Sequence, residues 1–368
     1  MSTVKTNAIL DASGGNTATI NSMTPTADSL QGFRNRLINS DMRIDQRNAG
    51  ASVTPTSGQY TLDRWGSYVS QTSKLTVQRS TTAPVNFINS LLVTSSSSYS
   101  VLTGDFFTAH QFIEGFNVSD LAWGTANAKT VTLSFWVRSS LTGTFGGTLG
   151  NSAGTRSYPF TYTISSANTF EQKTITITGD TSGTWLTDNG IGLRVYFGLG
   201  VGATYSGTAG AWATGNLVSA TGAVSVVGTN GATWYITGVQ LEVGTQATTF
   251  TTAGGSYGAE FALCQRYYWK YINDYIVSGF NENSSGFLAA FTLPTQMRTA
   301  PTMGTDASAT YRIRVPGATV TVTSLVGDSA TVSSFRINAA TSGGLTAGQG
   351  SILIANANGK FLDFSAEL

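Results

Sequence analysis

The sequence predicts an all-β protein, in which two antiparallel sheets pack face to face and one short helix leads to a second β-domain. Many short segments alternate apolar and polar residues, as half-buried strands do. Turn sequences such as Gly179-Asp180 and Asn189-Gly190 separate these segments. A helical spacing of apolar residues occurs clearly in one place, after Gly254-Gly255-Ser256. Together these observations predict packed antiparallel sheets and exclude a helical fold.

Composition limits the kinds of partner that such a protein can have. Of the 368 residues, 40% are hydrophobic and 11% are charged, which argues against a disordered chain. A homo-oligomer would explain how a chain with so little charge stays soluble. The net charge of +1 creates no broad field for nucleic acid or an anionic membrane, and no apolar run is long enough to span a bilayer. We therefore expect no nucleic-acid partner and no membrane insertion.

The first segment, residues 1–32, is predicted to be an N-terminal arm. Val4–Leu10 and Thr17–Asn21 resemble two short strands, but they hold too few apolar residues to fold alone. Such an arm is expected to attach the protein to a partner. The sequence starts without a basic stretch followed by an apolar core, so we expect synthesis in a cytoplasm rather than secretion.

Residues 33–252 are predicted to form the first β-domain. The side chains of Val131, Leu133, Phe135 and Val137 fall on one face of a strand, which leaves Trp136 and Arg138 on the other. The same alternation recurs in a second strand, with its apolar side chains at the positions Leu193, Val195 and Phe197. These patterns indicate two sheets that share one core.

Residues 253–272 are predicted to hold a linker and the helix. Ser256 is placed to cap the helix N-terminus. Apolar and aromatic residues then follow at steps of four, three and four, and they form the predicted seam Tyr257, Phe261, Cys264 and Tyr268. This seam would suit packing on a partner helix or sheet. Because Cys264 is the single cysteine, no intramolecular disulfide is expected.

Residues 273–368 are predicted to form a C-terminal β-sandwich-like domain. Tyr311, Ile313 and Val315 alternate with arginines, as in a strand with one buried face. Residues 352–357 and 360–364 flank Asn358-Gly359, a strong signal for a β-hairpin.

Several motifs resemble those of tailed-bacteriophage tail-fibre and appendage proteins with a carbohydrate-binding-module-like jelly roll. The resemblance covers roughly residues 33–300 and rests on the segments Arg36–Arg47, Tyr60–Trp65, Phe112–Gly115, Val131–Arg138 and Trp234–Tyr271. It implies a jelly roll for the first domain, a place in the virion and attachment to other virion proteins through residues 1–32. It also implies a homotrimer with the helix seam at its axis. These motifs belong to the scaffold of such proteins, so the resemblance assigns no ligand-binding residues to this sequence.

Motifs for catalysis are missing from the sequence. The single histidine, His110, has no Gly-x-Ser-x-Gly motif to pair with, and we expect it to be a hydrogen-bonded residue at a sheet edge. No paired histidines suit zinc and no phosphate-binding loop occurs, so we expect no enzyme, cofactor or metal. A polysaccharide depolymerase stays open as an alternative, because glycoside hydrolysis needs only two well-placed carboxylates. The acidic residues considered for it, which form no obvious pair, are Glu114, Asp180, Asp188 and Glu242.

Aromatic side chains outside the core predict a glycan site, since sugars stack their flat C–H faces on such rings. Trp136 and Arg138 are candidates on the polar face of their strand, and Tyr196 is placed on an equivalent face of another strand. The loop candidates, in Gly- and Thr-rich sequence, are Trp185, Tyr205 and Trp212. The alternative for each tryptophan is cover by another part of the protein or a role in fixing its own loop.

The function predicted is that of a fibre subunit that attaches the virion to a host-surface glycan. The alternative is a purely architectural head-fibre, collar or tail-decoration protein. Solvent-facing Trp136, Trp185 or Trp212 would favour glycan binding, whereas burial of all three would favour architecture.

Overall fold

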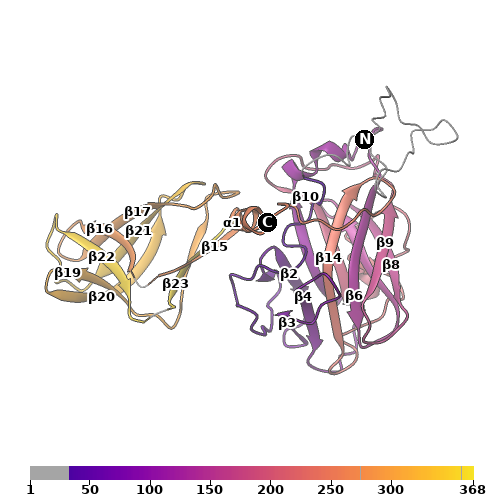
Figure 1. Ribbon diagram of the computed structural model, residues 1–368, viewed down its shortest axis with the longest axis horizontal. Helices are drawn as coiled ribbons and strands as arrows, with labels where there is room; N and C mark the ends of the chain where they lie inside the picture. Colours follow the sequence, from indigo (N-terminus) through magenta and orange to yellow (C-terminus); the bar gives the residue numbers. More distant parts are fainter. Residues whose placement is uncertain (1–32, 274, 358) are drawn as a thin grey trace, which may run out of the picture.

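The computed structural model describes residues 33–273, 275–357 and 359–368, which form two β-domains with a short helix between them (Figure 1). The described residues contain one α-helix and are otherwise strands, short 3-10 segments and loops. The predicted all-β class is confirmed, and the first domain is a jelly-roll-like sandwich. The predicted arm, residues 1–32, lies outside the described residues.

The first domain consists of a seven-stranded and a five-stranded sheet, each antiparallel. The seven-stranded sheet has the order β1 (Gln59–Leu62), β2 (Trp65–Val69), β5 (Phe106–Glu114), β10 (Ile191–Val201), β7 (Gly143–Gly150), β8 (Arg156–Ile164) and β12 (Ala213–Thr214). The five-stranded sheet has the order β3 (Leu75–Ser80), β4 (Ser90–Ser95), β14 (Thr233–Val243), β6 (Val131–Ser139) and β9 (Glu171–Ile177). A small parallel pair, β11 (Ser206–Gly207) and β13 (Ser219–Ala220), forms a separate sheet, and β13 packs against β7, β8 and β10.

The core of this domain lies between the inner faces of the two sheets. The predicted alternation in β6 and β10 is confirmed, because the apolar side chains of both strands are fully buried. The rings of Phe135 on β6 and Phe197 on β10 meet edge to face, 5.1 Å apart. Trp234 on β14 is also buried, and its indole N–H donates to the Tyr162 hydroxyl at 3.1 Å. Since both strands turn their apolar faces inward, their outer faces lie on opposite sides of the sandwich.

The helix α1 (Tyr257–Gln265) packs against the chain that leads into the first domain. Ser256 caps it as predicted, because its Oγ accepts a hydrogen bond from the Ala259 N–H at 3.3 Å. The Glu260 carboxylate accepts backbone N–H groups from Asn39 and Gly254, each at 2.5 Å. These bonds fix the helix to the Asn39 turn.

The predicted seam is only partly helical. Tyr268 belongs to a strand, β15 (Tyr268–Ile272), because the helix ends at Gln265 and the chain then pairs with β23 (Phe361–Ser365). Cys264 is fully buried in a cluster with Ile38 and Tyr267 of the same chain. Tyr257, in contrast, is 54% exposed. The chain therefore covers half of the seam itself, and contact between copies stays a prediction.

The C-terminal domain contains a closed six-stranded barrel instead of an open sandwich. Its strands, in order around the barrel, are β16 (Tyr275–Asn281), β17 (Gly286–Thr292), β21 (Ser334–Thr341), β20 (Ala318–Asp328), β19 (Tyr311–Val315) and β22 (Gly350–Ala355). In β19 the predicted alternation is confirmed, because Tyr311 and Ile313 are buried whereas Arg312 is exposed. A three-stranded sheet of β15, β23 and β18 (Thr302–Thr305) lies beside the barrel.

The predicted hairpin around Asn358-Gly359 is wrong. The strand β22 pairs with β16 and β19 in the barrel, whereas β23 is the central strand between β15 and β18. Leaving the hairpin gives β23 two hydrogen-bonded neighbours and buries Leu362 and Phe364. Burial and two-sided pairing thus outweigh the local turn signal.

The two domains meet at a junction built around two arginines from the first domain. The guanidinium carbons of Arg64 and Arg47 lie 3.6 Å from the ring centroids of Tyr267 and Tyr268, respectively. Glu367, which follows β23, accepts hydrogen bonds from Arg64 Nη1 and, at 2.7 Å, from Arg47 Nη2. One buried carboxylate therefore neutralises two cations from the other domain.

A second set of polar contacts lies at the same junction. Arg266 donates through Nη2 and Nε to the Glu114 carboxylate at the end of β5, at 2.5 and 2.9 Å, and Tyr267 donates its hydroxyl at 2.7 Å. Arg298 of the C-terminal domain donates to the Asn189 carbonyl oxygen at 2.9 Å. Several hydrogen-bonded groups thus hold the domains in one arrangement.

Replacing Glu367 with Gln should lower the free energy of unfolding by about 3–5 kcal/mol, because it leaves the cation of buried Arg64 without its anion. Urea unfolding followed by tryptophan fluorescence measures the loss. The matched control is Asp328→Asn, which removes the anion of the exposed Arg336 pair on the barrel and should leave the curve almost unchanged. Equal shifts for the two variants would contradict this account of the junction.

Candidate functional site

The candidate site is a groove on the outer face of the seven-stranded sheet, here named the aromatic groove. Its volume is about 340 Å³, which is within the range of small-molecule sites. Rings make up much of its wall, and the lining residues are Tyr68, Phe106, Thr108, Phe112, Ile191, Arg194, Tyr196, Tyr205, Asn216, Val218 and Leu368.

Strand alternation places these side chains on one face. Along β5, Phe106, Thr108 and Phe112 face outward, whereas Phe107 and Ala109 between them enter the core. In the register of β10 with β5, Arg194 lies opposite Phe112 and Tyr196 opposite His110. Similarly, Tyr68 of β2 lies opposite Thr108. Three neighbouring strands thus bring their outward side chains together.

The ring of His110 is stacked in the floor of the aromatic groove, between Tyr68 at 4.6 Å and Phe112 at 4.5 Å. Tyr196 meets Phe112 edge to face at 5.7 Å. The glycine at position 66 makes room for this stack, because a Cβ there would lie 2.7 Å from His110 Nε2. A packed set of rings therefore forms the floor, so its shape is largely fixed before a ligand binds.

His110 differs from its predicted role. It lies on β5, in the interior of the sheet between β2 and β10, rather than at an edge. Neither ring nitrogen has a hydrogen-bond partner among the described residues. Burial, and then the positive charges of Arg64 and Arg194, lower the pKa of His110 to about 3. The floor of the groove is therefore uncharged at neutral pH.

Polar groups are few in the aromatic groove and several are free. Arg194 donates from Nη2 to the Ser152 carbonyl oxygen and from Nη1 to Asn216 Oδ1 at 3.5 Å, whereas its Nε has no partner among the described residues. Thr108 Oγ1 is likewise unpaired among them. Burial raises the pKa of Tyr196, so that its hydroxyl stays protonated. Rings beside a few donors and acceptors are the arrangement that a sugar ring requires.

The structure separates the predicted ligand residues. Tyr196 and Tyr205 line the aromatic groove, and Tyr205 packs edge to face on Phe106 at 5.1 Å. Trp136 and Arg138 lie on β6, on the outer face of the other sheet. Trp136 and Tyr196 both face outward from their strands, but from different sheets, so the sandwich lies between them and they belong to separate surfaces.

Trp185 and Trp212 belong to another aromatic cluster, with Trp123. The three indoles meet edge to face at 4.8 to 5.5 Å. Trp185 donates its N–H to the Ser182 carbonyl oxygen at 3.0 Å, and Trp212 donates to that of Thr178 at 2.7 Å. Each indole N–H is thus used within the chain and fixes a loop. Both side chains and Trp136 are half-buried, so their exposure favours neither binding nor architecture.

The sequence prediction missed Tyr68, Phe106, Phe112 and Asn216 as groove residues. The alternation along residues 106–112 was a signal, but β5 carries Phe107 on its inner face as well. Aromatic residues on both faces of one strand hide which face is the core. Asn216 comes from a loop, where strand periodicity gives no information.

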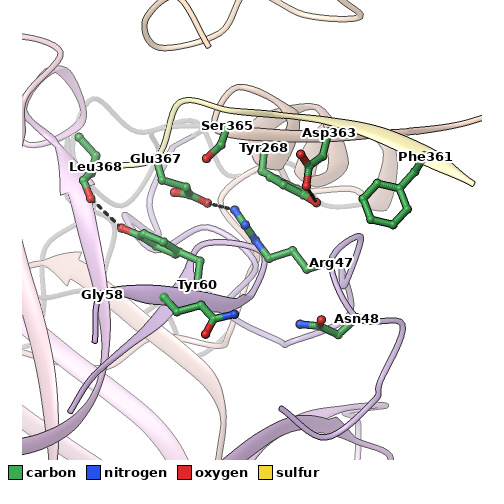
Figure 2. A pocket seen from close by; sticks show the side chains of 11 residues that line it. Arg47, Asn48, Gly58, Tyr60, Tyr268, Phe361, Asp363, Ser365, Glu367 and Leu368 are labelled. Carbon is green, nitrogen blue, oxygen red and sulfur yellow. Dashed lines mark hydrogen bonds and ion pairs between the residues drawn. The ribbon is translucent and has the colours of Figure 1, made fainter. Parts of the chain in front are cut away.

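A second cavity, of about 570 Å³, lies at the junction of the domains (Figure 2). Figure 2 shows the Arg47 guanidinium between Glu367 and Tyr268. The Tyr268 hydroxyl donates to Asp363 Oδ2 at 2.9 Å, and the Tyr60 hydroxyl donates to the Leu368 carbonyl oxygen at 3.0 Å. Because these polar groups already pair with each other, we assign this cavity to domain docking.

The acidic residues considered for hydrolysis have other roles. Asp180 is buried and paired with Arg156, and Glu242 is buried and accepts from Thr248. Among the described residues that line the aromatic groove, none is Asp or Glu.

The described residues also hold no cluster of three or more His, Cys, Asp or Glu side chains suited to a metal ion. No helix among these residues is long and apolar enough to cross a membrane.

The single histidine makes the state of the groove floor measurable. We expect the His110 imidazole signals in NMR spectra to show no titration between pH 5 and 8, because the pKa is near 3. In the unfolded chain the pKa of His110 is about 6.5, so as pH falls the unfolded state binds a proton before the folded state does. The free energy of unfolding therefore decreases as pH falls from 6.5 toward 3. A midpoint near 6.5 in the folded protein would contradict this.

No protein-family model matches the chain, and no curated protein matches it in sequence. Among solved structures it is similar to the enzymatically active domain of tailspike protein 4 of bacteriophage CBA120, with 14% identity, a TM-score of 0.32 and 58% of this chain but 22% of that chain covered. It is also similar to a putative sugar-binding protein from Bacteroides thetaiotaomicron, with 12% identity, a TM-score of 0.31 and 57% and 100% covered. A family 11 carbohydrate-binding module from Clostridium thermocellum has 12% identity, a TM-score of 0.29 and 55% and 100% covered. These values are low, and the groove's own side chains decide what it can bind.

Proposed function

We propose that this protein is a non-enzymatic phage virion subunit that binds a host-surface glycan in the aromatic groove. One observation carries the binding part: an outward sheet face holds packed rings next to a few polar side chains. Tyr68, Phe112 and Tyr196 offer the rings, and Arg194 and Asn216 offer the polar groups. The single hydrogen bond between these two side chains is long, at 3.5 Å, so a ligand hydroxyl group can compete for it.

The chemistry of the groove matches a sugar better than a purely apolar ligand. A sugar ring has C–H faces that pack on aromatic rings and hydroxyl groups at its edge that hydrogen-bond. Arg194 and Asn216 lie side by side on the wall and can serve several hydroxyl groups at once. A purely apolar ligand would leave these groups without partners.

The virion part of the proposal is supported by the sequence motifs that resemble phage appendage proteins. In this proposal residues 1–32 attach the subunit to other virion proteins, and three copies assemble as a homotrimer. The protein is made in the host cytoplasm and leaves it in the virion. Tyr257, exposed at the start of α1, is the seam residue still available to another copy.

The trimer makes a simple prediction. Multi-angle light scattering of the full chain at micromolar concentration should give three times the mass of one chain, which is 38.5 kDa. A stable monomer under these conditions would remove the trimer from the proposal.

Tyr205→Ala should weaken glycan binding about tenfold, because it removes one ring from the wall and an aromatic contact is worth about 1.4 kcal/mol. Binding is measured on an array of bacterial surface oligosaccharides and then by calorimetry. The matched control is Trp136→Ala, which removes a half-buried ring from the outer face of the opposite sheet and should leave binding unchanged.

Other outcomes of this experiment separate the alternatives. Loss of binding in Trp136→Ala but not in Tyr205→Ala would move the site to the other sheet. No glycan binding by the wild-type protein, together with normal adsorption of virions that lack it, would leave a purely architectural role. Release of reducing ends from a bound polysaccharide would identify a depolymerase.

A further inference from the structure

The charge of Arg194 is the feature of the aromatic groove that a neutral sugar would not use. Arg194 has the single charged side chain among the described residues that line the groove. Its guanidinium carbon lies 5.7 Å from the ring centroid of Phe112, so the cation faces the aromatic wall. A positive charge therefore lies directly at the place where the ligand would bind.

No described carboxylate forms an ion pair with Arg194. Its hydrogen-bond acceptors are neutral, namely the Ser152 carbonyl oxygen and Asn216 Oδ1. Glu114 lies on the same face of β5, but its carboxylate is bound by Arg266 and Tyr267. Three other arginines of this domain have an anion beside them, namely Arg36 with Asp120, Arg64 with Glu367 and Arg156 with Asp180.

The donor atoms of Arg194 are partly unused. The Nη1 bond to Asn216 is long at 3.5 Å, and the Nη2 bond goes to the neutral Ser152 carbonyl oxygen. The adjacent N–H groups of a guanidinium match the two oxygens of a carboxylate, and such charged hydrogen bonds are stronger than neutral ones. A half-buried cation without an anion also leaves its desolvation uncompensated. An anionic group on the ligand would supply stronger hydrogen-bond acceptors and the missing negative charge.

We infer that the aromatic groove selects an acidic glycan, and that Arg194 binds the carboxylate of a uronic or related acidic sugar while the adjacent rings hold the sugar. This inference rests on the proposed glycan binding. A phosphate or sulfate substituent would meet the same guanidinium, so the experiment has to separate these anions from a carboxylate.

The test is an array of bacterial surface oligosaccharides in which each carboxylate-bearing compound is printed both as the free acid and as its methyl ester. Neutral, phosphorylated and sulfated glycans complete the array. We expect binding to concentrate on free acids and to weaken with rising salt. Arg194→Gln should lower the affinity for these acids about 10- to 100-fold and lower the affinity for the esters much less, because only the acids lose a charged hydrogen bond.

Arg194→Lys is the matched variant, because it keeps the charge and loses the planar pair of N–H groups. It should bind the acids with an affinity between those of the wild type and Arg194→Gln. Unchanged thermal midpoints would show that both variants are folded. Equal binding of acids and esters, binding confined to phosphorylated or sulfated glycans, or full binding by Arg194→Gln would overturn the inference. An array without any bound glycan would remove glycan binding itself, and the inference with it.

Discussion

The guanidinium of Arg64 contacts both domains and the candidate site, and the rest of the structure depends on it. It binds Glu367 through Nη1, lies over the ring of Tyr267, and donates from Nη2 to the Phe112 carbonyl oxygen. Phe112 is a groove residue, so one buried cation fixes the backbone of the groove and the docking of the C-terminal domain together. Removing one partner of a buried ion pair is strongly destabilising, because it leaves an uncompensated buried charge. The relative position of the domains is thereby tied to the shape of the aromatic groove.

The aromatic groove owes its composition to the same alternation that builds the core. Along β5 every second side chain enters the core and the others face outward, and on this strand both sets contain Phe. An outward Phe106 or Phe112 has no packing partner in the opposite sheet, so these rings pack on Tyr205, Tyr196 and His110 instead. The outward rings thus form a second hydrophobic cluster on the surface of the sheet, and a ligand can contact its open side.

Local patterns predicted the strands well and their partners poorly. The alternation at residues 131–137 and at Tyr311 and Ile313 required only the two-residue period of a strand, and both strands are present. The Asn358-Gly359 hairpin failed because pairing partners are chosen by burial across the domain. Alternation also placed Trp136 and Tyr196 on outward faces without telling that their strands belong to different sheets. Asn216 reaches the groove from a loop and Tyr205 from the short 3-10 segment Ala203–Tyr205, where the strand period does not apply.

The pair of Arg47 and Glu367 joins residues 320 positions apart in the chain. During synthesis the first domain therefore leaves the ribosome long before the residue that neutralises Arg47 and Arg64. Until then both cations stay exposed to solvent and the junction face of the first domain is uncovered. Contacts of such long sequence separation form slowly, because the intervening chain must first be ordered. We therefore expect docking of the two domains to be a late step of folding, and we expect the uncovered face to be open to chaperones and to association with other chains until then.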